Sequence, residues 1–246
     1  MSLRLAVWSG PRNLSTAMMR SWENRDDCEV LDEPFYSYYL SKTGLPHPDA
    51  EAVMASQSQS WQDVVAQCRS DAPLGSAIYY QKQMTFHLLP EVDRRWMSDL
   101  THCFLIRDPR LVVASYAAIR ETPTLADLGF TQQAELYDSV CQATGSEPMV
   151  IDSSSFLKDP RLHLTAWCQI LRIPFSEKML SWPSGPRPSD GVWAPHWYQS
   201  VWASTGFSSA PSEPKPLPAR LEKLVEQARP YYDALYQRRL IPATHQ

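Results

Sequence analysis

The chain has 246 residues, 43% of them apolar, and carries a formal net charge of −4. This length and apolar content predict one domain that can bury a sizeable core without disulfides or metals. The charge excludes the broadly basic surface of a nucleic-acid binder, although an anionic small molecule fits a cleft where a few arginines gather.

The cysteines and the N-terminus bear on where the protein works. Five cysteines occur with no zinc-knuckle spacing, and their odd number indicates a reduced, intracellular environment. The sequence shows neither the residue order of a signal peptide nor an apolar run long enough to span a bilayer. We therefore expect a cytoplasmic protein with no membrane partner and no metal site.

Short apolar runs alternate with helical patterns along the chain. This alternation predicts an α/β fold in which helices cover a parallel sheet, with the ligand at the carboxyl ends of the strands. The predicted strands are Leu3–Trp8, Cys28–Leu31, Ser76–Tyr80, Cys103–Ile106 and Met149–Ile151. The predicted helices between them are Ser15–Asn24, Ser60–Arg69, Arg110–Arg120, Thr131–Thr144 and Pro160–Leu171.

The first predicted strand runs into a loop, P-R-N-L-S-T at positions 11–16, that opens a helix. N–H groups at a helix N-terminus carry partial positive charge and suit a phosphate or sulfate. Ser15 and Thr16 add hydroxyl donors, and Arg12 adds a planar cation that can bind two oxygens. The loop lacks the lysine and second glycine of G-x-x-x-x-G-K-[ST], so it differs from a nucleoside-triphosphate loop. An ordinary helix cap with a solvent-facing arginine is the alternative.

The fourth predicted strand ends at a second candidate anion site. Arg107 lies at its carboxyl end, and Ser115 follows eight residues later in the next helix. An arginine at a strand end and a hydroxyl two turns into a helix can converge on one phosphate. The alternative is a surface pair between Arg107 and Asp108 beside a small packing serine.

The C-terminal part is rich in proline and tryptophan. Eight of the 21 prolines lie within residues 183–218, together with Trp193, Trp197 and Trp202. This composition predicts an ordered lid or loop over the sheet, not a solvated linker. An amphipathic helix over Leu217 to Arg239 is expected to follow, with a kink or break at Pro230. Residues 1–246 are thus predicted to form one domain.

The two anion-binding segments resemble those of the sulfotransferase family, whose sulfuryl donor is 3′-phosphoadenosine-5′-phosphosulfate (PAPS). The family's loop P-[KR]-S-G-[ST]-[ST] is similar to positions 11–16, with Leu14 in place of the glycine, and its motif R-[DN]-P-x-x-x-x-x-S matches Arg107 to Ser115. The chain also resembles bacterial and plant proteins described as sulfotransferase-like or branched-chain-aminotransferase-like. The sequence shows no pyridoxal-phosphate site that would support the transaminase description. Their motifs P-R-N-x-S-T, D-E-P-[FL] and H-W-Y…S-T-G-F match Pro11–Thr16, Asp32–Phe35, and His196–Tyr198 with Ser204–Phe207.

The resemblance implies a P-loop NTPase-like three-layer domain, with a central parallel sheet flanked by helices, and a PAPS site. In that site the 5′-phosphosulfate would bind the first loop, and the 3′-phosphate would bind Arg107 and Ser115. The C-terminal aromatic cluster would form a lid over the adenine or the acceptor by stacking, although core packing is the alternative. The loop residues implied are Arg12, Asn13, Leu14, Ser15 and Thr16, and the cluster supplies Trp193 and His196.

Three residues after the second and third predicted strands are candidates for the chemistry of sulfuryl transfer. The resemblance implies that Glu33 is the base for the acceptor and that Lys82 stabilises the leaving oxygen. His87 is an alternative base, because imidazole titrates near neutrality. For Glu33 the alternative is a strand-end carboxylate that pairs with a neighbouring arginine. For His87 the alternative is a structural histidine.

The main hypothesis is therefore a PAPS-dependent sulfotransferase that acts on a hydroxyl or amine of a small molecule, without metal. One rival is a nucleotide kinase or NTPase with an aberrant loop. The other is a nucleotide-binding relative that has lost the chemistry, for which Leu14 is the main argument. The sequence indicates neither the acceptor nor the oligomeric state.

Overall fold

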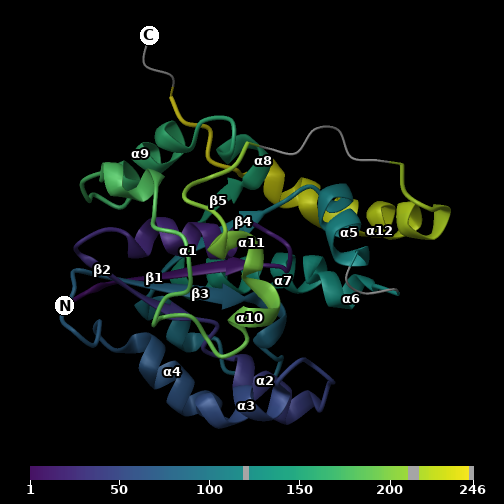
Figure 1. Cartoon of the computed structure of the whole chain (residues 1–246), viewed down its shortest axis with the longest axis horizontal. Helices are drawn as coiled ribbons and strands as arrows, with labels where there is room; N and C mark the ends of the chain where they lie inside the picture. Colours follow the sequence, from purple (N-terminus) through teal and green to yellow (C-terminus); the bar gives the residue numbers. More distant parts are fainter. Residues whose placement is uncertain (119–121, 210–215, 244–246) are drawn as a thin grey trace.

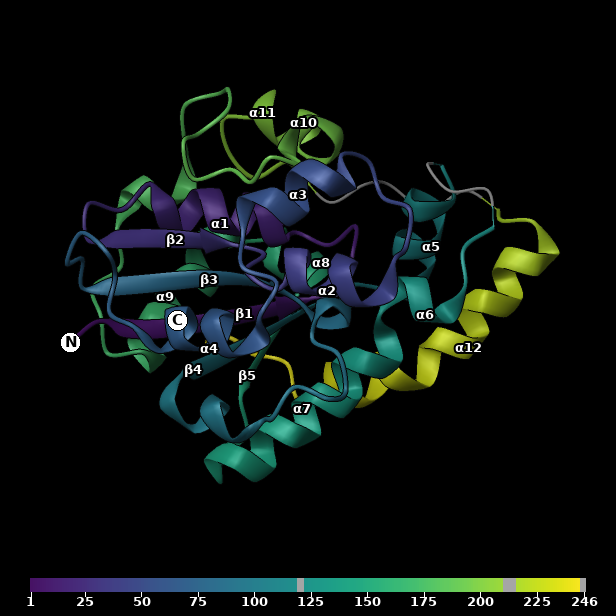
Figure 2. The same ribbon diagram turned by 90° about the horizontal axis from the view of Figure 1, so that it is seen from below.

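The computed structural model of the chain describes residues 1–118, 122–209 and 216–243. Five parallel strands form a central sheet in the order β2-β3-β1-β4-β5, which Figure 2 shows from β2 to β5. The strands are β1 (Leu3–Ser9), β2 (Cys28–Asp32), β3 (Ile78–Met84), β4 (Thr101–Ile106) and β5 (Met149–Asp152).

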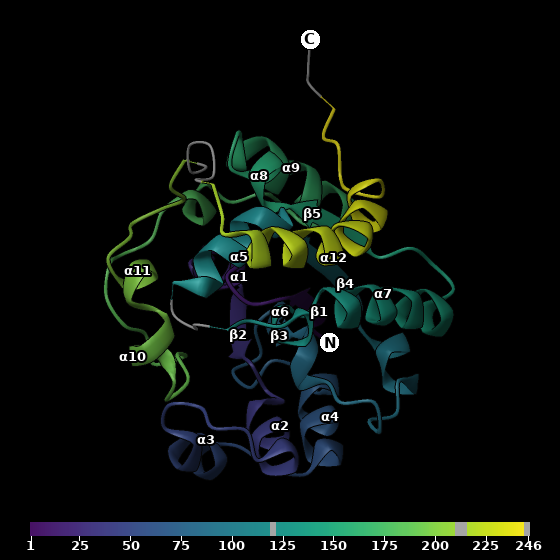
Figure 3. The same cartoon turned by 90° about the vertical axis from the view of Figure 1, so that its right-hand side faces the viewer.

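Helices cover both faces of the sheet, which confirms the predicted α/β fold (Figures 1 and 3). One face carries α1 (Ser15–Glu23), α8 (Ser153–Phe156) and α9 (Pro160–Ile170); the other carries α4 (Trp61–Arg69), α5 (Pro109–Ala117), α7 (Phe130–Thr144) and α12 (Ala219–Tyr236). The shorter elements are α2 (Tyr36–Thr43), α3 (Ala50–Ser56), α6 (Leu125–Leu128), α10 (Ala194–Trp197), α11 (Gln199–Trp202), η1 (Thr85–His87), η2 (Arg95–Asp99) and η3 (Glu177–Leu180). Within the described residues, no helix combines the length and apolar character needed to cross a bilayer.

Strand β1 shows why apolar runs without alternation become central strands. Leu5 and Val7 pack into the core under α1, while Ala6 and Trp8 pack into the core on the opposite face. All four side chains are fully buried. Burial of such a large apolar side chain contributes about 1.5–3 kcal/mol, so the run favours a position in the middle of the sheet.

The helix starts that contain Asp-Pro are confirmed. Asp108 accepts a hydrogen bond from the N–H of Arg110 at the start of α5, and Asp159 accepts one from Leu162 at the start of α9. In each case proline follows at the first helical position, where no N–H donor is needed. Such a cap contributes about 0.5–2 kcal/mol and places the residues before α5 at the sheet edge.

Two predicted boundaries are wrong. Strand β3 continues to Met84, so Lys82 lies within the strand and pairs in register with Val7 and Asp32. All seven residues of β3 are buried, including its polar ones, which sequence reasoning took for the loop after the strand. Helix α12 runs unbroken through Pro230, which lies on its exposed face. The predicted end of the α5 helix at Arg120 falls outside the described residues.

Residues 183–218, which we call the covering segment, lie beside α1, with 210–215 outside the described residues. Trp193, Ala194 and Tyr198 are buried against the core under α1. An isolated bridge between Ser181 and Gly206 closes the loop that carries α10 and α11. Figure 3 shows these two helices on the side of the sheet opposite to α7. The described part of this segment is therefore packed onto the domain.

Candidate active site

A cavity of about 340 Å³ lies at the carboxyl ends of the strands, where the sequence predicts the ligand. The first loop, residues 11–17, lines one side. Glu33, Lys82 and Arg107 line it from the ends of β2, β3 and β4, and residues 197–209 of the covering segment line the remaining side. Three strand ends, one helix start and a distant C-terminal segment thus meet in one place.

The first loop keeps its shape through its own side chains. Arg12 has a φ of 55°, in the left-handed region, whereas Leu14 has a φ of −82°. Asn13 donates to the carbonyl of Leu105 (2.8 Å), and its amide oxygen accepts the N–H of Leu14 (2.7 Å) and the hydroxyl of Ser153. Because the turn falls at Arg12, position 14 does not need a glycine, and the leucine packs against the core.

Helix α1 begins directly after this loop. Ser15 and Thr16 are its first residues, and both line the cavity. Gly10 lets the loop pass close to α6, because a Cβ at this position would lie 2.8 Å from the carbonyl oxygen of Leu128. The helix N-terminus therefore faces the cavity, as the sequence predicts for an anion site.

Two arginines meet beside the loop. The Nε of Arg12 donates to Oγ of Ser115 (2.9 Å), and Nη1 of Arg107 donates to the carbonyl of Arg12 (2.5 Å). Burial lowers the pKa of both guanidinium groups, and the charge of Arg12 lowers that of Arg107 further. Among the described residues, neither arginine has a carboxylate within ion-pair distance. The pair therefore forms a cationic site that suits an anion.

The surface-pair alternative for Arg107 does not hold. The carboxylate of Asp108 accepts two bonds from Arg229 of α12, at 2.9 and 3.2 Å, and also caps α5. Arg107 instead points to the first loop and lines the cavity. Helix α12 thus takes up the acidic neighbour and leaves Arg107 available to a ligand.

Lys82 lies at the centre of a second, opposite cluster. Its ammonium donates to Oδ1 of Asp32 (2.9 Å), to the hydroxyl of Tyr198 (2.5 Å) and to Oε1 of Glu33. Its side chain is almost fully buried. Burial alone would lower the pKa of Lys82, but the charges of Asp32 and Glu33 outweigh this effect and raise it. The lysine is therefore a charged group whose three N–H donors are all occupied.

Glu33 is the carboxylate of this cluster that lines the cavity. Its φ of 42° turns the chain sharply after β2, while its N–H still donates to the carbonyl of Lys82 (2.9 Å). Burial raises the pKa of Glu33; Lys82 opposes this effect and the charge of Asp32 adds to it. A buried carboxyl with a raised pKa is suited to accept a proton near neutral pH.

His87 lies next to Glu33 but is suited to a different role. Its ring stacks between Tyr36 and Tyr39, with ring centroids 4.4 and 4.8 Å away. Its Nδ1 lies 3.8 Å from Oε2 of Glu33 and has no hydrogen-bond partner in the described residues. Burial, with the charges of His47 and Lys82, lowers the pKa of His87 well below its ordinary value. The imidazole is thus neutral, and its Nδ1 is enclosed beside Glu33.

The structure separates the two predicted aromatic-cluster residues from the cavity. Trp193 is buried in the core and donates its indole N–H to the hydroxyl of Tyr198 (3.1 Å). His196 pairs with Asp49 at 2.6 Å near the surface. Their neighbours Trp197 and Tyr198 line the cavity instead. The aromatic cluster lies beside the cavity, but Trp197 and Tyr198 line it and Trp193 and His196 do not.

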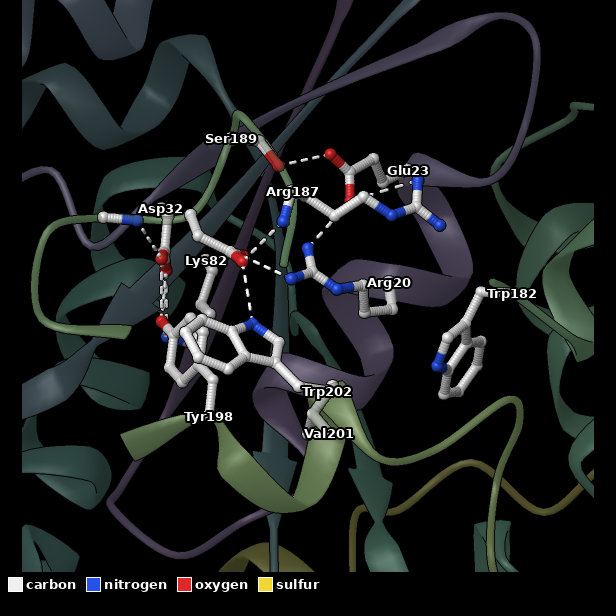
Figure 4. A network of polar contacts seen from close by, with 12 residues as sticks. Arg20, Glu23, Asp32, Lys82, Trp182, Arg187, Ser189, Tyr198, Val201 and Trp202 are labelled. Atoms are coloured by element: carbon white, nitrogen blue, oxygen red, sulfur yellow. Dashed lines mark hydrogen bonds and ion pairs between the residues drawn. The ribbon is translucent and has the colours of Figure 1, made fainter. Parts of the chain in front are cut away.

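Sequence reasoning assigned no role to Asp32 and counted Tyr198 only among the aromatic residues of the C-terminal lid, yet both contact Lys82. Both belong to motifs recognised from sequence, so their position in those motifs was the available signal. Their contacts depend on the register between β2 and β3 and on packing of the covering segment. Figure 4 shows Asp32, Lys82 and Tyr198 side by side.

Comparisons with known proteins identify the family of the chain. A sequence model described as Sulfotransferase domain matches residues 3–239. Two Arabidopsis thaliana proteins, named branched-chain-amino-acid aminotransferase-like proteins 1 and 2, are 38% and 36% identical to the chain over 235 and 229 residues. The matched regions cover 93% of this chain but only 40% of each plant protein, so the chain spans well under half of these relatives.

Solved structures show the same fold at low sequence identity. A sulfotransferase from Alicyclobacillus acidocaldarius superposes with a TM-score of 0.59 at 12% identity, covering 98% of both chains. A sulfotransferase domain from the curacin biosynthetic pathway gives a TM-score of 0.53 at 12% identity, covering 93% of this chain and 98% of the other. Sulfotransferase structures have a P-loop NTPase-like fold, which is the class predicted for this domain.

Proposed function

Because the chain belongs to the sulfotransferase domain family, we propose that it transfers a sulfuryl group from PAPS to a hydroxyl or amine of a small molecule. The observation that carries this proposal is the half-buried pair of Arg12 and Arg107, which lines the same cavity as Glu33 and Lys82. No carboxylate of the described residues lies within ion-pair distance of this pair. An unpaired cationic pair supports anion binding, and a carboxylate–lysine pair supports proton transfer and charge stabilisation.

The residues of the cavity fit the donor. Arg12, with Ser15 and Thr16 at the start of α1, would hold the 5′-phosphosulfate, and Arg107 with Ser115 would hold the 3′-phosphate. PAPS supplies the sulfuryl group and leaves as adenosine 3′,5′-bisphosphate (PAP). The start of α1 and the Arg12–Arg107 pair offer donors for two anionic groups at one cavity, which suits a nucleotide phosphorylated at two positions better than ATP.

The catalytic roles follow from the Lys82 cluster. Glu33 would take the proton of the acceptor hydroxyl or amine while that group forms its bond to sulfur. Lys82 would donate a hydrogen bond to the phosphate oxygen that keeps the electron pair of the broken sulfur–oxygen bond. His87 would support Glu33 as a neutral ring packed beside it, because its buried Nδ1 lies 3.8 Å from Oε2 of Glu33.

The acceptor side of the cavity favours a ring. Tyr36, Phe86, Tyr116 and Trp197 line it, and Tyr36 is in turn stacked on His87. Of the aromatic residues after Glu33, Tyr36 alone lines the cavity; Phe35 and Tyr38 belong to the core on the opposite face. Glu33 and Asp32 together outweigh the charge of Lys82, so we expect neutral or cationic rings to be better acceptors than carboxylates.

Calorimetry with PAP and transfer from ³⁵S-labelled PAPS test the proposal. A suitable acceptor panel is 4-ethylphenol, tyramine and 4-hydroxyphenylacetate, which share a ring but differ in charge. Binding of PAP and labelling of the first two would support the proposed function. Magnesium-dependent ATP turnover without PAP binding would favour a kinase or NTPase, and PAP binding without transfer across a broad panel would favour a non-catalytic relative.

A further inference from the structure

The three acceptors around Lys82 come from two distant parts of the chain. Asp32 ends β2, Glu33 follows it, and Tyr198 lies between α10 and α11 in the covering segment. The ammonium of Lys82 also lies 4.7 Å from the ring centroid of Tyr198. Glu33 lines the cavity beside this group, whereas Asp32 lies behind it. Of the two carboxylates that contact Lys82, only Glu33 can therefore be reached by the substrate that accepts the sulfuryl group.

Apart from Lys82, the covering segment supplies the side-chain contacts of Asp32 in the described residues. The hydroxyl of Tyr198 lies 2.8 and 2.7 Å from the two carboxylate oxygens of Asp32, and the N–H of Gly191 donates to Oδ2 (3.2 Å). Trp193 donates to the same Tyr198 hydroxyl, which also accepts from Lys82. The phenol thus accepts two hydrogen bonds and donates its own proton to Asp32, so its orientation is fixed.

The covering segment is itself fixed to α1 by buried ion pairs. Arg20 is almost fully buried and bridges Glu23 (2.9 Å) and Asp190. The second oxygen of Asp190 accepts from the N–H of Arg187 (2.8 Å) and from the indole of Trp202 (2.9 Å). Figure 4 shows this network next to the Lys82 cluster. Since Asp190 precedes Gly191, the anchor on α1 places the groups that hold Asp32.

We infer that Asp32 and Tyr198 are positioning residues for Lys82, and that the covering segment is part of the catalytic centre as well as its cover. They occupy two of the three N–H groups of Lys82, which leaves Glu33 as the exchangeable partner. This inference rests on the proposed function. When Glu33 takes the acceptor's proton it loses its charge, and one N–H of Lys82 becomes available to the leaving oxygen. Asp32 continues to balance the ammonium throughout.

Two conservative variants test the inference, with a matched control. Tyr198→Phe removes only the hydroxyl, and Asp32→Asn removes only the charge. Tyr232→Phe is the control, because its buried hydroxyl also bonds a strand-end carboxylate, Asp152 (3.0 Å), outside the Lys82 cluster. We expect transfer by Tyr198→Phe to fall about 10- to 100-fold with PAP affinity unchanged, since a misplaced group can cost about 10²-fold.

Asp32→Asn has a signature that a purely structural role would not produce. The charge of Asp32 raises the pKa of both Glu33 and Lys82, so the variant should move the acid limb of transfer to lower pH. The variant retains Tyr198 and His87, the other titratable residues that face this cluster. NMR with ¹³C-labelled lysine, with the Lys82 signal assigned by its loss in Lys82→Met, should show that Lys82 titrates at lower pH.

The outcomes separate the two proposals. Wild-type transfer by Tyr198→Phe, or an unmoved acid limb and lysine titration in Asp32→Asn, would overturn the positioning role. An equal loss in Tyr232→Phe would also contradict it. If the wild-type protein binds no PAP, the proposed function fails, whereas the lysine titration still decides whether Asp32 holds Lys82.

Discussion

The cavity contains two cationic sites, the Arg12–Arg107 pair and Lys82, which differ in whether carboxylates surround them. Arg12 lies close enough to Arg107 for its charge to lower the pKa of Arg107, and no carboxylate of the described residues lies within ion-pair distance of either arginine. Lys82 is surrounded by two carboxylates and a phenol. The first site is prepared for an anion that arrives from solution, whereas the second already contains its anions.

This difference separates binding from chemistry. Unpaired arginines gain their full interaction as soon as an anionic donor binds, so they contribute to ground-state affinity. A lysine whose donors are occupied gains a new partner only when one existing partner changes charge, which happens as the acceptor loses its proton. Interactions that form in the transition state are those that accelerate a reaction. We therefore expect changes at the two sites to have separable effects.

The largest effect is expected at the lysine cluster. Glu33→Gln should lower the rate of transfer about 100- to 10,000-fold, because the acceptor loses its base. PAP affinity, measured by calorimetry, should stay the same. Glu29→Gln is the matched control on the same strand, since Glu29 bonds the N–H groups of Leu74 and Ser76 far from the cavity. Full activity of Glu33→Gln would assign the base elsewhere.

The anchor of the covering segment should show the next largest effect, on stability. Arg20→Met leaves the buried carboxylate of Asp190 without the Arg20 cation, which should cost about 3–5 kcal/mol in the free energy of unfolding. Urea denaturation measures this change. Arg69→Met is the control, because its pair with Asp99 is exposed and should contribute no more than about 1 kcal/mol. Equal losses would show that burial of the anchor is unimportant.

The arginine pair should affect binding alone. Arg107→Ala should weaken PAP binding about 10- to 100-fold, because a hydrogen bond to a charged group contributes about 1.5–3 kcal/mol. Arg110→Ala, three residues further on, should bind PAP normally, since Arg110 pairs with Glu222. The Lys82 titration should be unchanged in both variants. A shift of that titration in Arg107→Ala would mean that the two sites are coupled.

The smallest effect is a pH dependence. Since the pKa of Glu33 is raised and the base must be ionised, transfer should decline as the pH falls through that raised value, by about tenfold per pH unit. The limb should lie above the ordinary glutamate pKa of about 4.3. His87→Asn should leave the limb in place, because the pKa of His87 is far lower than usual. A limb that disappears in this variant would identify His87 as the base.

Several features of the fold were predictable because they depend on neighbouring residues. Apolar runs without alternation gave the five strands, and Asp-Pro pairs gave the starts of α5 and α9. The end of β3 was not predictable. Lys82 and its neighbours Gln81 and Gln83 look like a loop in sequence, but they are buried and hydrogen-bonded to other segments. Polar residues mark a strand end only when no distant partner satisfies them.

The sequence alone indicated where the candidate anion site lies, because a helix start after a strand and an arginine at a strand end are local features. Tertiary structure decided which of the charged groups remain available. Asp108 follows Arg107 directly, yet it pairs with Arg229, 121 residues away. Lys82 is held by Tyr198, 116 residues away. Charge neutralisation acts over a few ångströms in space, so packing across the sheet decides which cations have carboxylate partners and which do not.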